Sequence, residues 1–236
     1  MYNIIKFDTL DSTNNYAKKN IEKFLDKTVI SAEIQTMGHG RFQRKWISDV
    51  PENIYCSIIL KPENKKHAAN LTQYMCVVLC KTLEKYKINP EIKWANDILI
   101  NSKKISGILC ENVNQKGIIL GVGINLNFEK ETLEKITQPA TALNIETGQK
   151  INKEEFQKKL LDHFFENYEL FMQQGFTFIK IDYLQRTKFI GKKIYISSEN
   201  NKKTEYIAKS INDDGSLLVT DNQKKEIILY SGDLSF

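Results

Sequence analysis

The sequence predicts an α+β protein in which helices pack on a mixed, largely antiparallel sheet, followed by a small C-terminal β-barrel. Three observations carry this prediction. Apolar residues recur at helical spacing in three segments, short apolar stretches separated by turn residues fill the middle of the chain, and only short strand-like segments follow Gly191. We place the boundary between the two domains near Thr187, which gives domains 1–187 and 188–236.

The elements of the first domain follow in order. The run Asp11-Ser12-Thr13-Asn14 is typical of a helix cap, and apolar residues follow at helical spacing as far as Leu25. Later apolar residues with helical period predict helices at 67–86 and 152–174, the second capped by Asn152 and ended by Gly175. Strands are expected at 29–33, 53–60, 92–94, 98–100, 104–111 and 118–125, the last four as an antiparallel meander.

The C-terminal domain is expected to hold strands alone. These lie at 193–197, 205–211, 217–220 and 226–229, and they are separated by turn-rich pieces at 198–202, 212–215 and 220–223. Short strands with tight turns at this spacing are typical of a small β-barrel.

Composition describes an ordinary globular chain of 236 residues, with 41% hydrophobic and 27% charged residues. Its apolar runs are far shorter than the roughly 20 residues that span a bilayer, and its N-terminus lacks a secretory pattern, so we expect a cytoplasmic protein without membrane contact. The formal charge of +5 is spread along the chain, which favours a solvated surface over a nucleic-acid site.

Cysteines and histidines indicate neither a disulfide framework nor a metal cluster. The four cysteines form no CxxC pair, and Cys76 and Cys80 are one helical turn apart in an apolar segment. We expect reduced, mostly buried thiols. The three histidines, His39, His67 and His163, are dispersed.

The stretch 38–46 combines two glycines with a high density of cations. Gly38 and Gly40 allow tight turns and a close approach of the backbone to a ligand, and Arg41, Arg44 and Trp46 lie beside them. Such a loop is suited to close over a negatively charged substrate. A basic surface loop beside an aromatic residue is the alternative interpretation.

Two polar motifs have both a structural and a functional interpretation. Ser12-Thr13-Asn14 either caps a helix or exchanges hydrogen bonds with a neutral polar ligand. Lys93 to Asp97 is either a hairpin turn or a place where Asn96 and Asp97 face a metal-bound phosphate, since Mg²⁺ prefers oxygen ligands.

Two further motifs lie on predicted strands. Lys104 precedes a small residue and Gly107, so its ammonium group can point into a cleft, whereas we interpret Lys103 as a solvated turn residue. The glycines at 121 and 123 indicate a close approach by another group. This segment is not a dinucleotide fingerprint, and the sequence has no P-loop, GxSxG or HExxH motif.

In order and spacing, these motifs resemble the catalytic domain of biotin protein ligases. Ser12-Thr13-Asn14 is similar to the STN of that family, and 35–46 to its Q-x-x-G-R-G-R-x-G-R-x-W loop. Segments 93–97, 104–111 and 121–125 are similar to KWPND, K-x-x-G-I-L-x-E and G-x-G-I-N, and 140–143 to ATSL. The resemblance covers essentially the whole chain. It implies a class II synthetase-like and biotin-ligase-like fold with an SH3-like C-terminal domain.

The chain departs from the family pattern mainly in the loop. His39 replaces an arginine, and Phe42 and Gln43 replace a polar residue and a glycine. Ala95 and Asp49 replace prolines. The loop changes are expected to alter its mobility and the retention of the intermediate, and we expect 38–45 to be mobile until ligand binds.

The resemblance implies ATP-dependent biotinylation of a lysine on a biotin carboxyl carrier protein, through biotinyl-5′-AMP. It implies Arg41 and Lys104 as catalytic residues and Asp97 as a contact for Mg²⁺. The implied biotin-binding residues are Ser12, Thr13, Asn14, Gln35, Gly38, His39, Gly40, Arg41, Lys104 and Gly107. The implied ATP- and adenylate-binding residues are Arg41, Arg44, Trp46, Lys93, Asn96, Asp97 and Asn125.

The alternatives are a lipoate–protein ligase, whose RRxSGGG loop is absent, and a non-catalytic protein that binds biotin or nucleotide. Because Ser12 lies close to the start of the sequence, we expect a monofunctional form without an N-terminal DNA-binding domain and no nucleic-acid partner. Monomer and homodimer both remain open.

Overall fold

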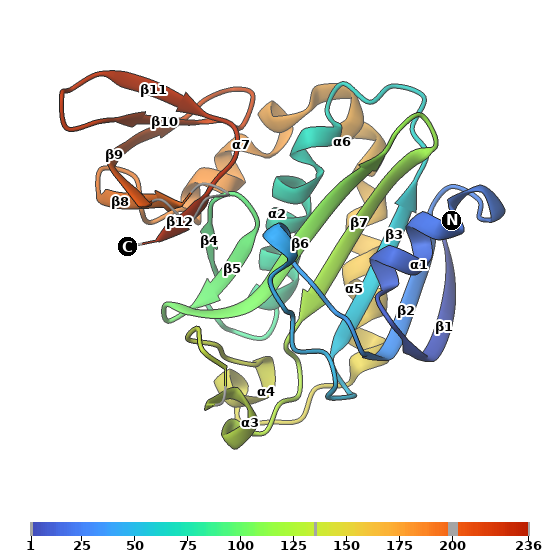
Figure 1. Cartoon of the computed structure of the whole chain (residues 1–236). Helices are drawn as coiled ribbons and strands as arrows, with labels where there is room; N and C mark the ends of the chain where they lie inside the picture. Colours follow the sequence, from blue (N-terminus) through green and yellow to red (C-terminus); the bar gives the residue numbers. More distant parts are fainter. Residues whose placement is uncertain (1, 135, 198–202, 236) are drawn as a thin grey trace.

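The computed structural model describes residues 2–134, 136–197 and 203–235. Its centre is a seven-stranded sheet in the order β1-β2-β3-β7-β6-β5-β4, with a separate C-terminal sheet beside it (Figure 1). The strands of the large sheet are β1 (Asn3–Leu10), β2 (Thr28–Gln35), β3 (Ile54–Leu60), β4 (Glu91–Lys93), β5 (Asp97–Ile100), β6 (Lys103–Val113) and β7 (Gly117–Ile124).

The large sheet is mixed and mostly antiparallel, as predicted. Only β1 and β2 pair in parallel, and every other neighbouring pair is antiparallel, including the expected meander from β4 to β7. A parallel pair needs a crossover connection, and the helix α1 (Thr13–Lys19) supplies it between β1 and β2.

Each face of the sheet is covered differently. On one face, Ala17 and Ile21 pack with Ile30, Ile59 and Ile119, so α1 and the turn after it cover the middle strands. The opposite face carries the larger core and the longer helices (Figure 1). These helices are α2 (Leu71–Glu84), α5 (Lys153–Glu166), α6 (Tyr168–Gln174) and α7 (Phe176–Gln185). Two short helices, α3 (Lys130–Glu134) and α4 (Leu143–Thr147), lie at the end of β7.

The prediction of one helix over 152–174 was wrong. Asn152 caps α5 as expected, since its Oδ1 accepts the Glu155 N–H at 2.9 Å, and Gly175 ends α6. The helix breaks at Asn167, where the backbone has φ −117° and ψ 7°. Because α5 and α6 both bury their apolar faces in the same core, the apolar period continues through the break. The helices α3, α4 and α7 were not predicted, and the strand β1 was implied only by placing Ser12 at a strand-to-helix junction, without a range.

The C-terminal residues form a five-stranded antiparallel sheet in the order β11-β10-β9-β8-β12. Its strands are β8 (Lys193–Ser197), β9 (Lys203–Ile211), β10 (Leu217–Thr220), β11 (Glu226–Leu229) and β12 (Asp233–Ser235). Within the described residues β11 and β12 are the two edges of this sheet, and closure into the predicted barrel is not seen among them. The turn predicted at 198–202 lies outside the described residues.

One apolar core connects the two sheets. Ala208, Val219 and Leu234 of the C-terminal sheet belong to the same buried cluster as α2 and the large sheet. The Trp94 indole N–H donates to the Gly215 carbonyl at 3.2 Å. The domain boundary at Thr187 therefore stays a prediction.

The four cysteines are free, and three of them are buried. Burial raises the pKa of the Cys56 thiol to about 12. Within the described ranges, no helix combines the length and apolar character that crossing a membrane requires.

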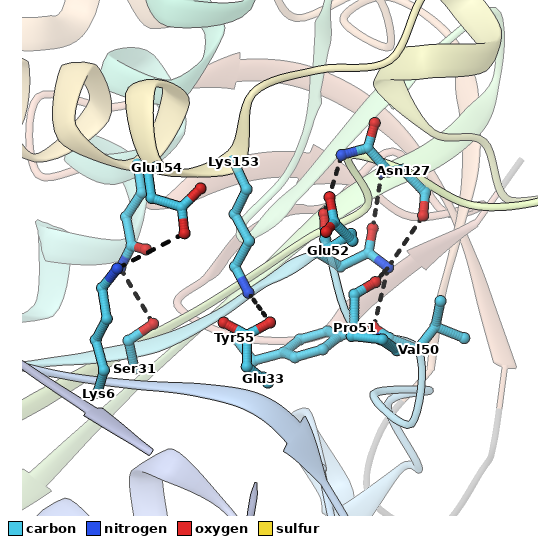
Figure 2. A network of polar contacts seen from close by, with 12 residues as sticks. Lys6, Ser31, Glu33, Val50, Pro51, Glu52, Tyr55, Asn127, Lys153 and Glu154 are labelled. Atoms are coloured by element: carbon cyan, nitrogen blue, oxygen red, sulfur yellow. Dashed lines mark hydrogen bonds and ion pairs between the residues drawn. The ribbon is translucent and has the colours of Figure 1, made fainter. Parts of the chain in front are cut away.

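An ion pair between a buried lysine and a half-exposed glutamate fixes the start of α5 to the sheet. Lys153 points from the helix toward Glu33 of β2, beside Tyr55, and its Nζ lies 2.7 Å from the Glu33 carboxylate (Figure 2). The Lys153 side chain is only 6% exposed, whereas Glu33 is 43% exposed. The lysine therefore depends on Glu33 far more than Glu33 depends on the lysine.

This asymmetry predicts unequal effects of removing either partner. We expect Glu33→Gln to lower the free energy of unfolding by about 2 kcal/mol, because it leaves a buried ammonium group without its counter-charge. Lys153→Met should change it by less than about 1 kcal/mol, because Glu33 can return to solvent. Urea denaturation measures both, and equal losses would contradict this account.

Candidate functional site

Three glycines, Gly107, Gly121 and Gly123, leave part of the α1-facing surface of the sheet without side chains. We call this surface the glycine floor. Gly107 of β6 pairs directly with Gly123 of β7, and Gly121 lies two residues away on the same face. A Cβ on Gly123 would lie 2.6 Å from Trp46 Cε2, and a Cβ on Gly121 would overlap Asn14 Oδ1. The missing side chains therefore allow Trp46 and Asn14 to lie directly against the strands.

The same floor explains the spacing of Lys104 and Gly107. Gly107 lies opposite Asp97 in the β5–β6 pair, and a Cβ on it would come within 3.2 Å of Lys104 Cε and Nζ. The lysine side chain thus crosses Gly107 and places its ammonium group 2.7 Å from Asp97 Oδ1. It also lies 5.4 Å from the centre of the Trp46 ring.

Cations and carboxylates alternate at this end of the site. The Lys93 ammonium group lies 3.5 Å from Asp97 and 3.9 Å from Asp233, and Arg44 pairs with Asp233. With Arg41 and Lys104, four cations surround two carboxylates. The excess of positive charge fits this end of the site for an anion.

Arg41 connects the loop to both sheets. Its guanidinium group donates to Asn96 Oδ1 at 3.1 Å and to the Gly232 carbonyl at 3.0 Å. Burial lowers the pKa of Arg41, although Asp97 and Asp233 act in the opposite direction. The side chain remains charged, because even a lowered arginine pKa stays far above neutrality.

The other end of the site is polar but mostly neutral. Thr13 donates through its backbone N–H and its hydroxyl to Gln35 Oε1, at 2.8 and 3.0 Å. The Ser57 hydroxyl lies 2.8 Å from Thr13 Oγ1 and 2.5 Å from Asn14 Oδ1. Ser12 caps α1 by accepting the Asn15 N–H at 3.4 Å, so the capping interpretation holds while its hydroxyl hydrogen stays available.

The loop 38–46 folds back on itself between these two ends. The Gly40 N–H donates to the Arg44 carbonyl at 2.8 Å, and the Trp46 N–H donates to the Gly38 carbonyl at 2.9 Å. Between them, Phe42 and Gln43 both have positive φ, 55° and 56°. The residue that replaces the glycine of the family pattern therefore has a backbone conformation that favours glycine. That this loop is mobile without ligand stays a prediction.

A cavity of about 510 Å³ lies between the floor and the loop. The predicted site residues that line it are Ser12, Thr13, Asn14, Gln35, His39, Gly40, Arg41, Arg44, Trp46, Asn96, Asp97, Lys104, Gly107 and Asn125. Gly38 and Lys93 do not line it. Gly38 packs against Ser48, whose Oγ a Cβ would overlap, and Lys93 acts on the cavity through Asp97 and Asp233.

Several residues that line the cavity were not predicted from the sequence. Asp233 lines it from β12, and the stretch 136–138 with Ala140 lines it beside Lys104. The Lys104 N–H donates to the Pro139 carbonyl, and Asn125 Nδ2 donates to the Thr141 carbonyl at 3.0 Å. The only available signal was the resemblance of 140–143 and of the chain end to family segments, neither of which was given a site role.

Comparison with known proteins shows consistent similarity. A sequence model of the biotin/lipoate A/B protein ligase family matches residues 6–128. The bifunctional ligase/repressor BirA of Bacillus subtilis is 32% identical over 240 residues, which cover 98% of this chain and 73% of that protein. The chain spans 65% of the corresponding Bacillus spizizenii protein. The biotin–[acetyl-CoA-carboxylase] ligase of Paracoccus denitrificans is 26% identical, with 92% of this chain and 94% of that protein covered.

A solved structure agrees over the full chain. The biotin protein ligase of Aquifex aeolicus in complex with biotin and ATP superposes with a TM-score of 0.84 at 28% identity. The superposition covers 100% of this chain and 98% of that one.

The glycine floor predicts the effect of adding one methyl group. We expect Gly123→Ala to displace Trp46 from the strand and shift its fluorescence emission to longer wavelength, because the partly buried indole becomes more exposed to water. Gly40→Ala is the matched control, since its Cβ would meet nothing closer than 3.9 Å. Identical spectra for the two variants would contradict this role of Gly123.

The positive φ at Gln43 predicts which residues the loop tolerates. Gln43→Gly and Gln43→Asn should keep the loop closed. Gln43→Val should destabilise the closed conformation relative to the open one by about 1 to 2 kcal/mol, because a β-branched residue is strained there. We expect trypsin to cut Gln43→Val after Arg41 and Arg44 about fivefold faster or more. Equal rates for valine and asparagine would contradict the closed geometry.

Proposed function

Because the chain belongs to the biotin/lipoate A/B protein ligase family, we propose that it uses ATP to attach biotin to a lysine of a biotin carboxyl carrier protein. The Paracoccus relative is named a biotin–[acetyl-CoA-carboxylase] ligase, and the Aquifex structure holds biotin and ATP. The protein is thus an AMP-forming ligase that works through biotinyl-5′-AMP.

The polarity of the cavity supports this function most directly. Biotin has a neutral ureido ring at one end, an apolar chain, and a carboxylate at the other end. The cavity has neutral hydrogen-bonding groups at Thr13 and Asn14, a bare floor with Trp46 in the middle, and cations at Arg41 and Lys104. The order of these groups along the cavity therefore matches the order of the chemical groups along biotin.

The first step joins two anions, so the protein must offset their repulsion. A biotin carboxylate oxygen forms a bond to the α-phosphorus of ATP, and the bond from that phosphorus to the bridging oxygen breaks to release pyrophosphate. Arg41 and Lys104 serve the carboxylate and α-phosphate, while Arg44 and Asn96 serve the remaining phosphates. Lys93 supports them through Asp97 and Asp233. Preorganised cations of this kind need no rearrangement as charge develops.

The remaining residues have binding roles in this proposal. Ser12, Gln35 and Gly40 bind biotin with Thr13 and Asn14, and His39 closes the cavity above them. Gly38 shapes the loop by packing against Ser48. Asn125 faces the adenine side, next to the stretch at 136–138. The folded loop excludes water from the adenylate, which would otherwise hydrolyse.

The carboxylates fit only a magnesium ion that arrives with ATP. Among the residues that the structure describes, no three histidine, cysteine, aspartate or glutamate side chains are placed to hold a metal together. Asp97 is already paired with Lys104 and Lys93, so it would supply one ligand and the phosphates the others. Bound there, Mg²⁺ would neutralise charge on the departing pyrophosphate.

In the second step, the amine of the acceptor lysine attacks the carbonyl carbon of the mixed anhydride. AMP leaves, and the nitrogen loses a proton to give the amide. The acceptor is a biotin carboxyl carrier protein or domain, as the names of the carboxylase ligases suggest. A monomer or a homodimer satisfies this mechanism, and it needs no nucleic acid.

Biotin-dependent exchange of labelled pyrophosphate into ATP tests the first step. We expect Lys104→Ala to lower the exchange rate roughly 100-fold or more, since a preorganised charge is lost next to the reacting groups. Lys103→Ala is the matched control, because this neighbouring lysine is exposed and lies outside the cavity lining.

Three outcomes would contradict the proposal. Exchange supported by lipoate in place of biotin would favour a lipoate ligase. A lack of exchange with either acid would indicate a non-catalytic binding protein. Equal loss of rate in Lys103→Ala and Lys104→Ala would remove Lys104 from the reaction.

A further inference from the structure

One carboxylate beside the neutral end of the cavity has no role in the mechanism above. Glu111 of β6 is partly buried and lies between two residues of α1 that are one helical turn apart. Its Oε2 accepts from Asn14 Nδ2 at 2.8 Å, and its Oε1 pairs with the Lys18 ammonium group at 2.8 Å. Asn14 lines the cavity, whereas Glu111 does not.

Glu111 determines which way the Asn14 amide is turned. An ionised carboxylate can only accept hydrogen bonds, so it must face the amide nitrogen and not the amide oxygen. Burial raises the pKa of Glu111, but the hydrogen bonds from Lys18 and Asn14 outweigh it and lower that pKa overall. The Asn14 oxygen is therefore directed away from Glu111, toward Ser57 and the surface of Gly121.

In this orientation of Asn14, the hydroxyl groups around it offer fewer hydrogens than there are acceptors. Gln35 Oε1 takes the hydroxyl hydrogen of Thr13, so Thr13 Oγ1 can only accept from Ser57. Ser57 has a single hydrogen and two acceptors within reach, Thr13 Oγ1 and Asn14 Oδ1. The cluster is thus one hydrogen short and suited to a ligand that brings an N–H group.

A hydrogen-bond donor lies beside this acceptor. Because Gln35 Oε1 accepts both hydrogen bonds from Thr13, the Gln35 amide nitrogen is left to donate. Gln35 and Asn14 both line the cavity. An acceptor and a donor side by side complement a cyclic urea, which offers N–H and C=O together.

We propose that Glu111 is a positioning residue for the biotin ring: it holds the Asn14 amide so that Oδ1 accepts a hydrogen bond from a ureido N–H. This inference rests on the proposed function. Glu111 touches neither substrate and acts only through Asn14, so it sets affinity and selectivity for the ring while the chemistry of the carboxylate end is unaffected.

The test measures pyrophosphate exchange in wild type, Glu111→Ala, Glu111→Gln, Asn14→Ala and the double variant Asn14→Ala/Glu111→Ala. We expect Glu111→Ala to raise KM for biotin about tenfold and to leave kcat and KM for ATP within about twofold. Glu111→Gln should show a smaller rise, since its amide permits either orientation of Asn14. The double variant should be no worse than Asn14→Ala, because the two residues act as one unit.

A biotin analogue methylated at a ureido nitrogen separates positioning from a general loss of structure. Wild type should discriminate strongly against it, and Glu111→Ala and Glu111→Gln should discriminate less. Glu205→Ala is the matched control, because Glu205 is also a strand carboxylate paired with a lysine, at 3.0 Å, in the C-terminal sheet. It should behave as wild type.

The outcomes are distinguishable. Unchanged discrimination in Glu111→Gln, or equal rises of KM for biotin and for ATP, would overturn the positioning role while leaving the ligase function intact. Additive losses in the double variant would also overturn it. A wild-type protein without biotin-dependent exchange would overturn the proposed function and this inference with it.

Discussion

The absence of side chains at Gly107, Gly121 and Gly123 is the constraint on which the site depends. Interior strand positions normally project a side chain about every second residue on each face, and here that space is given to groups from elsewhere in the chain. Trp46 occupies the space above Gly123, and Lys104 crosses Gly107 to reach Asp97. Asn14, Lys104 and Trp46 can therefore line the cavity from positions that a side chain on any of the three glycines would occupy.

The second organising feature is the balance of charge at one end of this floor. Cations that repel one another are held together because Asp97 and Asp233 lie between them. Asp233 comes from the last strand of the chain, so the C-terminal sheet completes the anion-binding end. Arg41 reinforces this link through the Gly232 carbonyl. These polar contacts add to the continuous apolar core that joins the two sheets.

At the neutral end of the cavity, hydrogen bonds and not charges determine selectivity. Its cavity-facing side chains Ser12, Thr13, Asn14 and Gln35 are buried and uncharged, and the Glu111 carboxylate behind them is paired with Lys18. Hydrogen-bond direction, and not net charge, therefore sets what this end can bind. Thr13 is fixed by Gln35, and Asn14 is fixed by Glu111. An elongated ligand with one neutral and one anionic end therefore has a single favourable orientation in the cavity.

The sequence by itself determined most elements, the antiparallel meander, the free cysteines and the motif residues, because these depend on short-range periodicity and on residue types at fixed spacing. It missed the break at Asn167, since the apolar period continues through a kink. It left the pairing order of the C-terminal strands open, since strand pairing is a long-range property. Only the tertiary structure decided that Asp233 joins the site and that Glu111 orients Asn14 across 97 positions of sequence. Such contacts depend on the register of distant strands, which no local pattern records.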